Sequence, residues 1–286
     1  MPSTIDIRRR IRSVKNTQQI TKAMKMVAAA KLRRAQERIF AARPYAGGLR
    51  EILTSVASRV DADRHPLLAV RQDERNVLVV VVTGDKGLAG PFNANVLKAT
   101  VNLVLEHNWE NVELLPIGRK AKDFFKRRTY KVRPQAPQVL QALSIETARE
   151  IANSIASGYL NGELDAVYVV YNEFRSIMSQ VVRTERLLPI ERDWEEQTDS
   201  VDYLYEPGPE EILSELLPKH IEFQLYRILL ESAAAEQGAR MTAMEAATRN
   251  ASDMIDHLTL TYNRIRQAAI TKEIIEIVSG AAAAKK

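Results

Sequence analysis

A glycine-rich segment at residues 82–93 is the first place to look for chemistry. Its glycines, Gly84, Gly87 and Gly90, are three residues apart, after an apolar run and before a helical pattern. Phosphate-binding loops occupy such a strand-to-helix position. The spacing matches neither the dinucleotide fingerprint nor the phosphate loop, which needs Gly-Lys followed by Ser or Thr. We therefore interpret the segment as a structural turn, with Asn93 capping the helix.

Other chemistry-bearing residue types are scarce or scattered. The sequence has no cysteine, so disulfides, thiolate metal sites and cysteine catalysis are excluded. The four histidines show no metal-ligand spacing, and no Ser, His and acid arrangement stands out. Acidic pairs such as Asp73-Glu74 and Glu195-Glu196 are typical of solvated loops. The sequence therefore predicts no catalytic residue, no cofactor site and no metal site.

Positive charge is concentrated at the start of the chain. Residues 1–50 hold 13 of the 41 Lys and Arg residues but only 2 of the 36 Asp and Glu residues. Such a basic arm can bind nucleic acid, anionic lipid or an acidic protein surface. From the charge alone, nucleic acid is the first of these alternatives, since phosphate is the commonest partner of an arginine-rich helix.

A long helix is predicted from Ser3 to about Ser58. Ser3 or Thr4 is a suitable N-cap, with Asp6 in the first turn, and Pro44 is expected to bend the helix without ending it. Apolar residues recur at steps of four and three, which places each group on one face. The groups are Ile7, Ile11 and Val14; Ile20, Met24 and Val27; and Leu32, Ala35 and Ile39.

A still longer helical pattern of roughly 70 residues follows the breaker at residues 206–209. Steps of four and three place two sets of residues on coiled-coil seams, and the two sets are out of phase near residues 240–247. The sets are Ile221, Leu225, Ile228, Ser232, Ala235 and Ala239, and then Ala251, Ile255, Leu258, Tyr262, Ile265 and Ala269. We expect the two terminal helices to pack antiparallel. Since the C-terminal helix is the longer one, its apolar end around Ile270–Val278 is expected to project and to need a socket.

The residues between the helices change period. Strands are predicted at 76–83, 112–117, 130–132, 165–171 and 179–188, with helices at 93–106, 120–127 and 144–157 between the first four. This alternation favours a mainly parallel sheet that ends in an antiparallel hairpin. The fold class is therefore α/β: a Rossmann-like central domain (75–200) between an N-terminal coiled-coil helix (1–58) and a C-terminal coiled-coil helix (209–286).

Targeting signals are not evident. The longest apolar run, residues 77–82, is far below the roughly 18 residues of a membrane span. No apolar stretch follows Arg8, Arg9 and Arg10, so the N-terminus does not read as a secretory signal, and we expect a cytoplasmic location.

Three segments carry a more specific resemblance. Residues 7–29 resemble the opening helix of the gamma subunit of F-type ATP synthases. Residues 263–281 resemble the signature of that family, with Ile-Thr-x-Glu from Ile270, a second acid at Glu276 and Gly-Ala at Gly280. The turn at 83–93 is similar to the central glycine-rich turn of the family. The resemblance covers essentially the whole chain.

The resemblance implies a non-catalytic central shaft, present in one copy. It stands inside a ring of three alpha and three beta subunits, and its α/β block lies against an epsilon subunit and a membrane rotor ring. It passes torque between the membrane rotor ring and the catalytic hexamer of alpha and beta subunits. In this way it regulates ATPase activity and proton flow at the cytoplasmic face of the bacterial membrane. The basic arm then meets an acidic lever of the beta subunits rather than nucleic acid.

Residue by residue, the resemblance assigns partner-binding positions. Lys22, Met24 and Lys25 match the shaft position that faces the acidic lever. A second set matches the patch that grips a loop of one beta subunit at a time: Arg266, Gln267, Thr271 and Glu273. Tyr203, Tyr205 and Glu206 match, more weakly, the foot on the membrane ring. Photosynthetic members carry an insertion with a regulatory cysteine pair. Its absence from the sequence removes thiol control of rotation.

Overall fold

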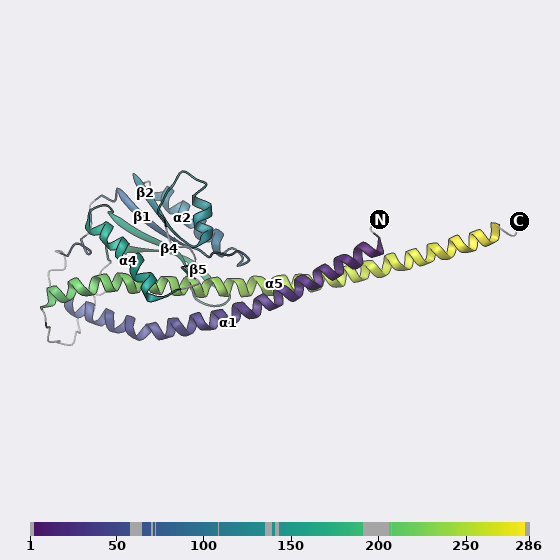
Figure 1. Cartoon of the computed structure of the whole chain (residues 1–286), viewed down its shortest axis with the longest axis horizontal. Coiled ribbons are helices and arrows are strands. Elements are labelled where there is room, and N and C mark those ends of the chain that lie inside the picture. Colours follow the sequence, from purple (N-terminus) through teal and green to yellow (C-terminus); the bar gives the residue numbers. More distant parts are fainter. Residues whose placement is uncertain are drawn as a thin grey trace. The chain divides into compact units, whose positions relative to one another are not determined.

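Two helices that begin and end the described chain dominate the computed structural model (Figure 1). Helix α1 spans Thr4–Ala57 and helix α5 spans Pro209–Ala283. The structure describes residues 3–57, 65–69, 71, 73–107, 109–134, 139–140, 143–190, 206 and 208–283. The chain divides into two compact units, Met1–Val27 with Met241–Lys286, and Ala28–Arg240. Both helices contribute to both units, so the three-part division predicted from the sequence stays a prediction.

The larger unit contains an α/β block. Its strands are β1 (Asn76–Val82), β2 (Asn111–Ile117), β3 (Lys131–Val132), β4 (Ala166–Phe174) and β5 (Gln180–Leu188), and its helices are α2 (Phe92–His107), α3 (Arg119–Phe125) and α4 (Ile145–Leu160). The sheet order is β3-β2-β1-β4-β5. The first four strands are parallel, and β5 is antiparallel to β4. The predicted Rossmann-like alternation and the terminal hairpin are confirmed.

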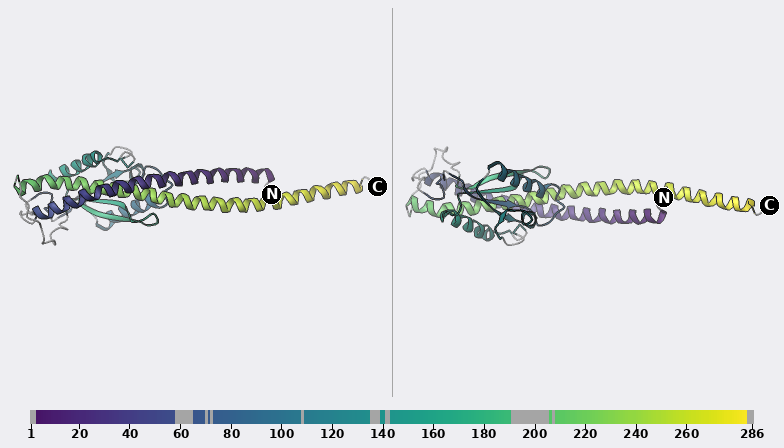
Figure 2. Two further views of the ribbon diagram at one scale, coloured as in Figure 1. Left: turned by 90° about the horizontal axis from the view of Figure 1, so that it is seen from below. Right: turned by 90° about the horizontal axis from the view of Figure 1, so that it is seen from above.

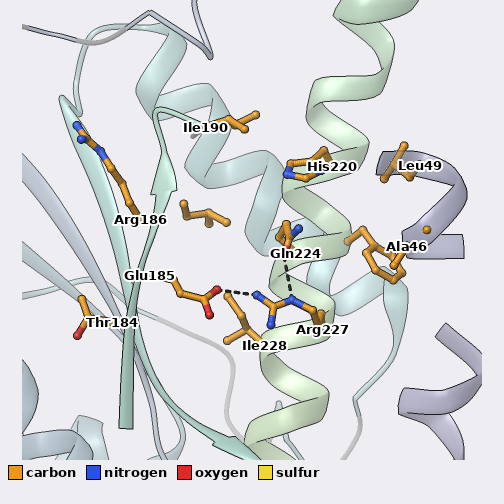
Figure 3. Close-up of a pocket in the computed structure, with 13 residues that line it drawn as sticks. Ala46, Leu49, Thr184, Glu185, Arg186, Ile190, His220, Gln224, Arg227 and Ile228 are labelled. Carbon is orange, nitrogen blue, oxygen red and sulfur yellow. Dashed lines mark hydrogen bonds and ion pairs between the residues drawn. The ribbon is translucent and has the colours of Figure 1, made fainter. Parts of the chain in front are cut away.

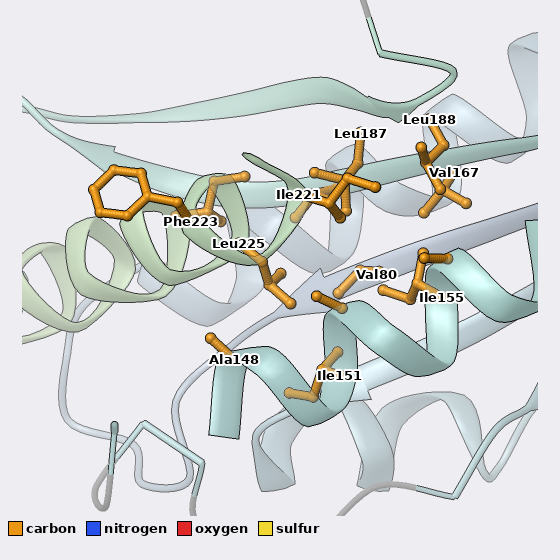
Figure 4. Packing of buried hydrophobic residues seen from close by; sticks show 14 of the residues in the cluster. Val80, Ala148, Ile151, Ile155, Val167, Leu187, Leu188, Ile221, Phe223 and Leu225 are labelled. Atoms are coloured by element: carbon orange, nitrogen blue, oxygen red, sulfur yellow. The ribbon is translucent and has the colours of Figure 1, made fainter. Parts of the chain in front are cut away.

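Strand β1 shows why the sheet lies at the centre of this unit. Six consecutive Val and Leu residues are buried, and their side chains alternate between two cores as a strand requires. Leu78, Val80 and Val82 belong to one core, and Val77, Val79 and Val81 to the other. The first core contains residues of α4 and α5, and the second contains residues of α2 and α3. Figure 4 shows Val80 among Ile151 and Ile155 of α4 and Leu225 of α5.

Buried apolar side chains attach α5 to the α/β block. Ile221, Leu225 and Ile228 are all at most 1% exposed, and each fully buried aliphatic side chain contributes about 1.5–3 kcal/mol. The residues predicted from Ile221 to Ala239 are therefore buried, but Ile221, Leu225 and Ile228 belong to the core that also contains the sheet and α4. Their assignment to a coiled-coil seam stays a prediction. Helix α5 also continues through Pro218, and α1 continues through Pro44. The bend predicted at Pro44 stays a prediction.

The smaller unit is an antiparallel pair formed by the first part of α1 and the last part of α5 (Figure 2). Three contacts fix its register: the Arg8 guanidinium donates to the Tyr262 hydroxyl at 2.6 Å, the hydroxyls of Thr21 and Thr248 lie 2.8 Å apart, and Lys25 pairs with Glu245 at 3.1 Å. The residue numbers of each pair add up to 269 or 270, as a constant antiparallel register requires. The predicted packing of the terminal helices is confirmed in this unit.

One part of the predicted seam is wrong. Ile20 and Val27 are 60% and 56% exposed, whereas Thr21 is buried at 8% exposure. Since α5 presents Thr248 opposite Thr21, a polar pair with its own hydrogen bond occupies the seam that the apolar pattern had assigned to Ile20. The outer groups are confirmed, because Ile7 and Leu32 are both 3% exposed.

The start of α1 confirms the predicted cap. The Ser3 hydroxyl accepts a hydrogen bond from the Asp6 backbone N–H at 3.2 Å and donates to the Asp6 carboxylate at 2.9 Å. The hydrogen bonds from Ser3 lower the pKa of Asp6, as expected for a carboxylate in the first turn of a helix. None of the helices in the described part of the chain is long and apolar enough to cross a membrane.

Candidate partner-binding site

The last part of α5 is the clearest candidate site. Given the register of the smaller unit, Arg266 lies opposite Thr4, where α1 begins. Every described residue of α5 from Arg266 to Gly280 is exposed. The exposed fraction is 56% at Ile274, 58% at Ile275 and 71% at Ile277. The predicted apolar overhang is confirmed, and an apolar surface of this kind indicates a binding partner.

Four of the residues assigned by resemblance lie together on this overhang. Arg266, Gln267, Thr271 and Glu273 are all exposed. The Thr271 hydroxyl donates to the Gln267 backbone carbonyl at 3.0 Å, which orients its side chain along the helix. The side chains of Arg266, Gln267 and Glu273 have no hydrogen bond or ion pair to the described residues, so their polar groups are available to a second protein.

The second set lies on α1. Lys22 is exposed, Met24 is partly buried, and Lys25 is tied to Glu245. The Lys25–Glu245 pair is about 40% exposed on both sides, so it contributes at most about 1 kcal/mol. A partner carboxylate can therefore compete for Lys25, while Lys22 has no ion pair among the described residues.

The third set comprises the residues that the resemblance assigns to the foot on the membrane ring. Tyr203 and Tyr205 lie outside the described residues, and Glu206 is exposed. Their assignment to a foot stays a prediction.

The glycine-rich turn has a structural role. Asn93 is the second residue of α2, so it does not cap the helix as predicted; instead its side-chain carbonyl accepts from the Gly84 N–H at 2.9 Å and holds the turn closed. A Cβ at Gly84 would lie 2.7 Å from the Glu236 carboxylate of α5, and Arg240 donates to Glu236 at 2.5 Å. Glycine at this position thus lets the turn approach a buried ion pair of α5.

A polar cluster that sequence reasoning missed joins β4 and β5 to α5. Arg227 donates to Glu185 at 2.6 Å, to Glu231 at 3.0 Å and to Gln224 at 2.9 Å, and Tyr171 donates to Glu185 at 2.5 Å. Figure 3 shows Arg227 between Glu185 and Gln224 at one side of a cavity of about 610 Å³.

Burial and neighbouring charge set the protonation of this cluster. Burial would lower the pKa of Arg227, but Glu185, Tyr171 and Glu231 outweigh it and raise that pKa. Burial and the hydrogen bond to Glu185 raise the pKa of Tyr171, and burial also raises the pKa of Glu231. The Arg227 and Glu185 side chains are partly buried, at 32% and 37% exposure, and their ion pair joins β5 to α5, so the cluster is suited to anchoring α5. Among the described residues, no group of His, Asp or Glu is arranged to hold a metal ion.

Comparison with known proteins identifies the family. A family model described as ATP synthase matches residues 3–284. The gamma chain of ATP synthase from Solibacter usitatus is 56% identical, and that from Chlorobaculum tepidum is 52% identical, each covering 100% of both chains. This chain belongs to the ATP synthase gamma chain family. The resemblance inferred from residues 7–29 and 263–281 is confirmed, and the assignment to a non-catalytic subunit follows from the family.

Solved structures agree with the family. A chain of the central stalk and c-ring of Tetrahymena thermophila mitochondrial ATP synthase has a TM-score of 0.58 at 29% identity, covering 80% of this chain and 99% of that chain. A chain of Euglena gracilis mitochondrial ATP synthase shares the fold with a TM-score of 0.69 at 22% identity, covering 98% and 94%.

Proposed function

We propose that this chain is the central-stalk rotor subunit of a proton-translocating F-type ATP synthase. One observation carries the proposal: in a chain more than half identical to named gamma chains, α5 outlasts its antiparallel partner and ends in an exposed apolar segment. A socket formed by a ring of three alpha and three beta subunits would cover that segment. The chain itself binds no nucleotide in this proposal, and its partners contain the catalytic sites.

The coupling mechanism needs asymmetry and stiffness. A helix pair without threefold symmetry meets three beta subunits with three different faces, and each face biases its beta subunit toward a different nucleotide affinity. Turning the pair moves this bias around the ring. The interlocked seam from Arg8–Tyr262 to Lys25–Glu245 resists twisting of the pair.

The exposed polar residues provide the angle-dependent contacts. Arg266 and Gln267 are proposed to grip a loop of one beta subunit at a time, with Thr271 and Glu273 beside them, because charge-assisted hydrogen bonds are stronger than neutral ones. Lys22, Met24 and Lys25 are proposed to face an acidic lever of the beta subunits. Tyr203, Tyr205 and Glu206 are proposed to contribute to the foot near the epsilon subunit and the membrane c-ring.

The location follows from the assembly. The gamma chain is held at the membrane by its complex, and we propose the cytoplasmic face of the bacterial inner membrane. Through its contacts with the ring, the chain would regulate ATPase activity and proton flow.

Purification from native membranes tests the proposal. A tagged chain is expected to retain alpha and beta subunits in a ratio of three each to one gamma chain. Recovery of the chain without those subunits, or DNA binding with a steep salt dependence by the purified chain, would instead support the nucleic-acid alternative that the basic arm left open.

A further inference from the structure

Four cationic side chains line one small pocket of the larger unit. The pocket, of about 310 Å³, lies between α1, the glycine-rich turn and α5. Lys31, Arg34 and Arg38 follow one another along α1 at steps of three and four, so they share one face, and Lys86 comes from the turn. All four are exposed, and their side chains have no hydrogen bond or ion pair to the described residues. We call this cavity the Arg34 pocket.

The carboxylates of the Arg34 pocket do not balance these cations. Two carboxylates are among the described lining residues, Glu236 and Asp85. Glu236 accepts from a fifth cation, Arg240, at 2.5 Å, and Asp85 accepts from the Arg119 backbone N–H at 2.9 Å. Positive charge therefore exceeds negative charge by three in a small volume. Since like charges repel, this arrangement is unfavourable until an anion enters.

The turn side of the pocket is held in place by its own hydrogen bonds. Asn93 accepts from the Gly84 N–H at 2.9 Å and donates to the Lys86 backbone carbonyl at 3.3 Å. Arg240 of α5, whose side chain is 11% exposed, donates to the Gly87 carbonyl at 3.4 Å. A backbone that is already fixed lowers the entropic cost of binding a ligand.

The size and the lining of the Arg34 pocket select the ligand. Its volume is at the lower end of the roughly 300–1,000 Å³ that ligand pockets span, so the ligand is small. The guanidinium groups of Arg34 and Arg38 present N–H pairs that match the oxygens of a phosphate group, and Lys31 and Lys86 add point charges. The described lining residues include no aromatic ring on which a nucleobase could stack. An inorganic anion therefore fits better than a nucleotide.

We propose that the Arg34 pocket binds an inorganic oxyanion of the phosphate class, and that a diphosphate matches its charge better than a single phosphate. Arg34 and Arg38 bind the anion from α1, and Lys86 binds it from the turn. The bound anion thus links α1 to the α/β block through charge rather than through apolar packing.

Calorimetric titration of the full chain with pyrophosphate tests the proposal. Pyrophosphate is expected to saturate one site per chain, and inorganic phosphate to bind that site at least threefold more weakly because it carries less charge. Parallel titrations with ADP distinguish a free diphosphate from one attached to a nucleoside, and ADP is expected to bind no more tightly than pyrophosphate. Tighter binding of ADP, or no binding of pyrophosphate, would overturn the proposal.

Charge-matched variants separate the pocket from general attraction to a basic chain. Arg34→Gln with Arg38→Gln is expected to weaken pyrophosphate binding at least tenfold, with a thermal midpoint of the ligand-free chain that is unchanged or higher, because unpaired exposed cations are removed. Lys86→Gln, on the turn, should weaken binding at least threefold. The control, Arg9→Gln with Arg12→Gln, removes the same charge from exposed positions of α1 in the other unit and should change the affinity less than twofold. Equal losses in the two double variants would overturn the proposal.

Discussion

At the scale of single residues, the exposed positions of α1 and α5 determine what a partner can bind. Met24 is partly buried beside two lysines that a partner could reach. The nearest seam contact, Lys25–Glu245, already satisfies one of these lysines. A change at Met24 therefore alters the charge presented to the partner without removing a buried side chain from the seam.

We predict that Met24→Lys impairs coupling more than assembly. The added positive charge strengthens one contact with the acidic lever, so one rotor angle becomes too stable for efficient turnover. The measurement is proton pumping per ATP hydrolysed in membrane vesicles, with Met178→Lys on the β4–β5 hairpin as the control, since Met178 is 88% exposed in the other unit. Equal pumping ratios in Met24→Lys and wild type would refute the predicted contact.

Asp165 gives a residue-scale prediction about stability. Burial raises its pKa, but hydrogen bonds from the Asn76 N–H at 2.7 Å and from Arg71 at 2.8 Å outweigh burial, so the pKa of Asp165 is lowered. A lowered pKa in the folded state means that the stabilisation is complete above the unfolded pKa of about 3.9 and is lost as pH falls through the folded value.

Asp165→Asn is therefore expected to reduce the free energy of unfolding at pH 7 by about 3 kcal/mol, because it removes the charge that pairs with Arg71 and accepts from the N–H groups of Arg75 and Asn76. The difference from wild type should shrink as the pH falls below about 4. Urea unfolding from pH 7 to pH 3 measures both effects. Asp73→Asn, in an exposed pair with Arg75, should cost less than about 1 kcal/mol. A difference that stays constant over this pH range would show that Asp165 is not stabilised as a carboxylate.

At the scale of elements, the sequence predicted each strand and short helix of the described residues to within a few residues. Runs such as Val77–Val82 favour a buried strand. In the structure, the Ser144 hydroxyl accepts from the Thr147 N–H and caps α4, a detail that the sequence analysis did not predict. The error at Ile20 and Val27 has a physical cause: the partner helix, not the intrinsic hydrophobicity of α1, decides which face is buried. The Arg227 cluster was missed because Glu185 and Arg227 are 42 residues apart and neither belongs to a local motif.

The register of the helix pair can be tested with an engineered disulfide. The chain has no cysteine, so Thr21→Cys with Thr248→Cys introduces a single possible bridge. Since the two hydroxyls lie 2.8 Å apart, mild oxidation is expected to close the bridge almost completely. In the control pair, Thr21→Cys with Arg249→Cys, the second cysteine lies one residue further along α5 and projects in another direction. This pair should form less than about a tenth as much disulfide. Similar yields from both pairs would contradict the register.

The turn between β2 and α3 provides a second prediction for an element. Gly118 has φ of 94°, and a Cβ there would lie 1.9 Å from the Thr83 carbonyl oxygen. Gly162 has φ of 78° but open space around it. Gly118→Ala is expected to destabilise the chain by more than about 3 kcal/mol, and Gly162→Ala by about 1–2 kcal/mol, because only the first adds a clash to the backbone strain. Thermal unfolding of the two variants measures both losses of stability. Equal losses would mean that the backbone of the turn moves to relieve the clash at position 118.

At the scale of the whole molecule, the chain is a scaffold whose chemistry belongs to its partners. Its buried or partly buried polar side chains at Arg227, Asp165 and Glu236 hold elements together, and its exposed polar side chains at Arg266 and Gln267 have no partner among the described residues. The resemblance at the two ends of the sequence supplied the function that composition and periodicity had left open. Charge alone had favoured nucleic acid, because a basic helix carries no information about which anion it meets.

Direct observation of rotation tests whether the chain is a rotor. A reporter attached at Leu105→Cys, which is 69% exposed on α2, would follow the chain while the alpha and beta subunits are fixed to a surface. With ATP supplied, the reporter is expected to turn in one direction with three pauses in each turn. ATP hydrolysis at a normal rate with a stationary or randomly fluctuating reporter would contradict the rotor function.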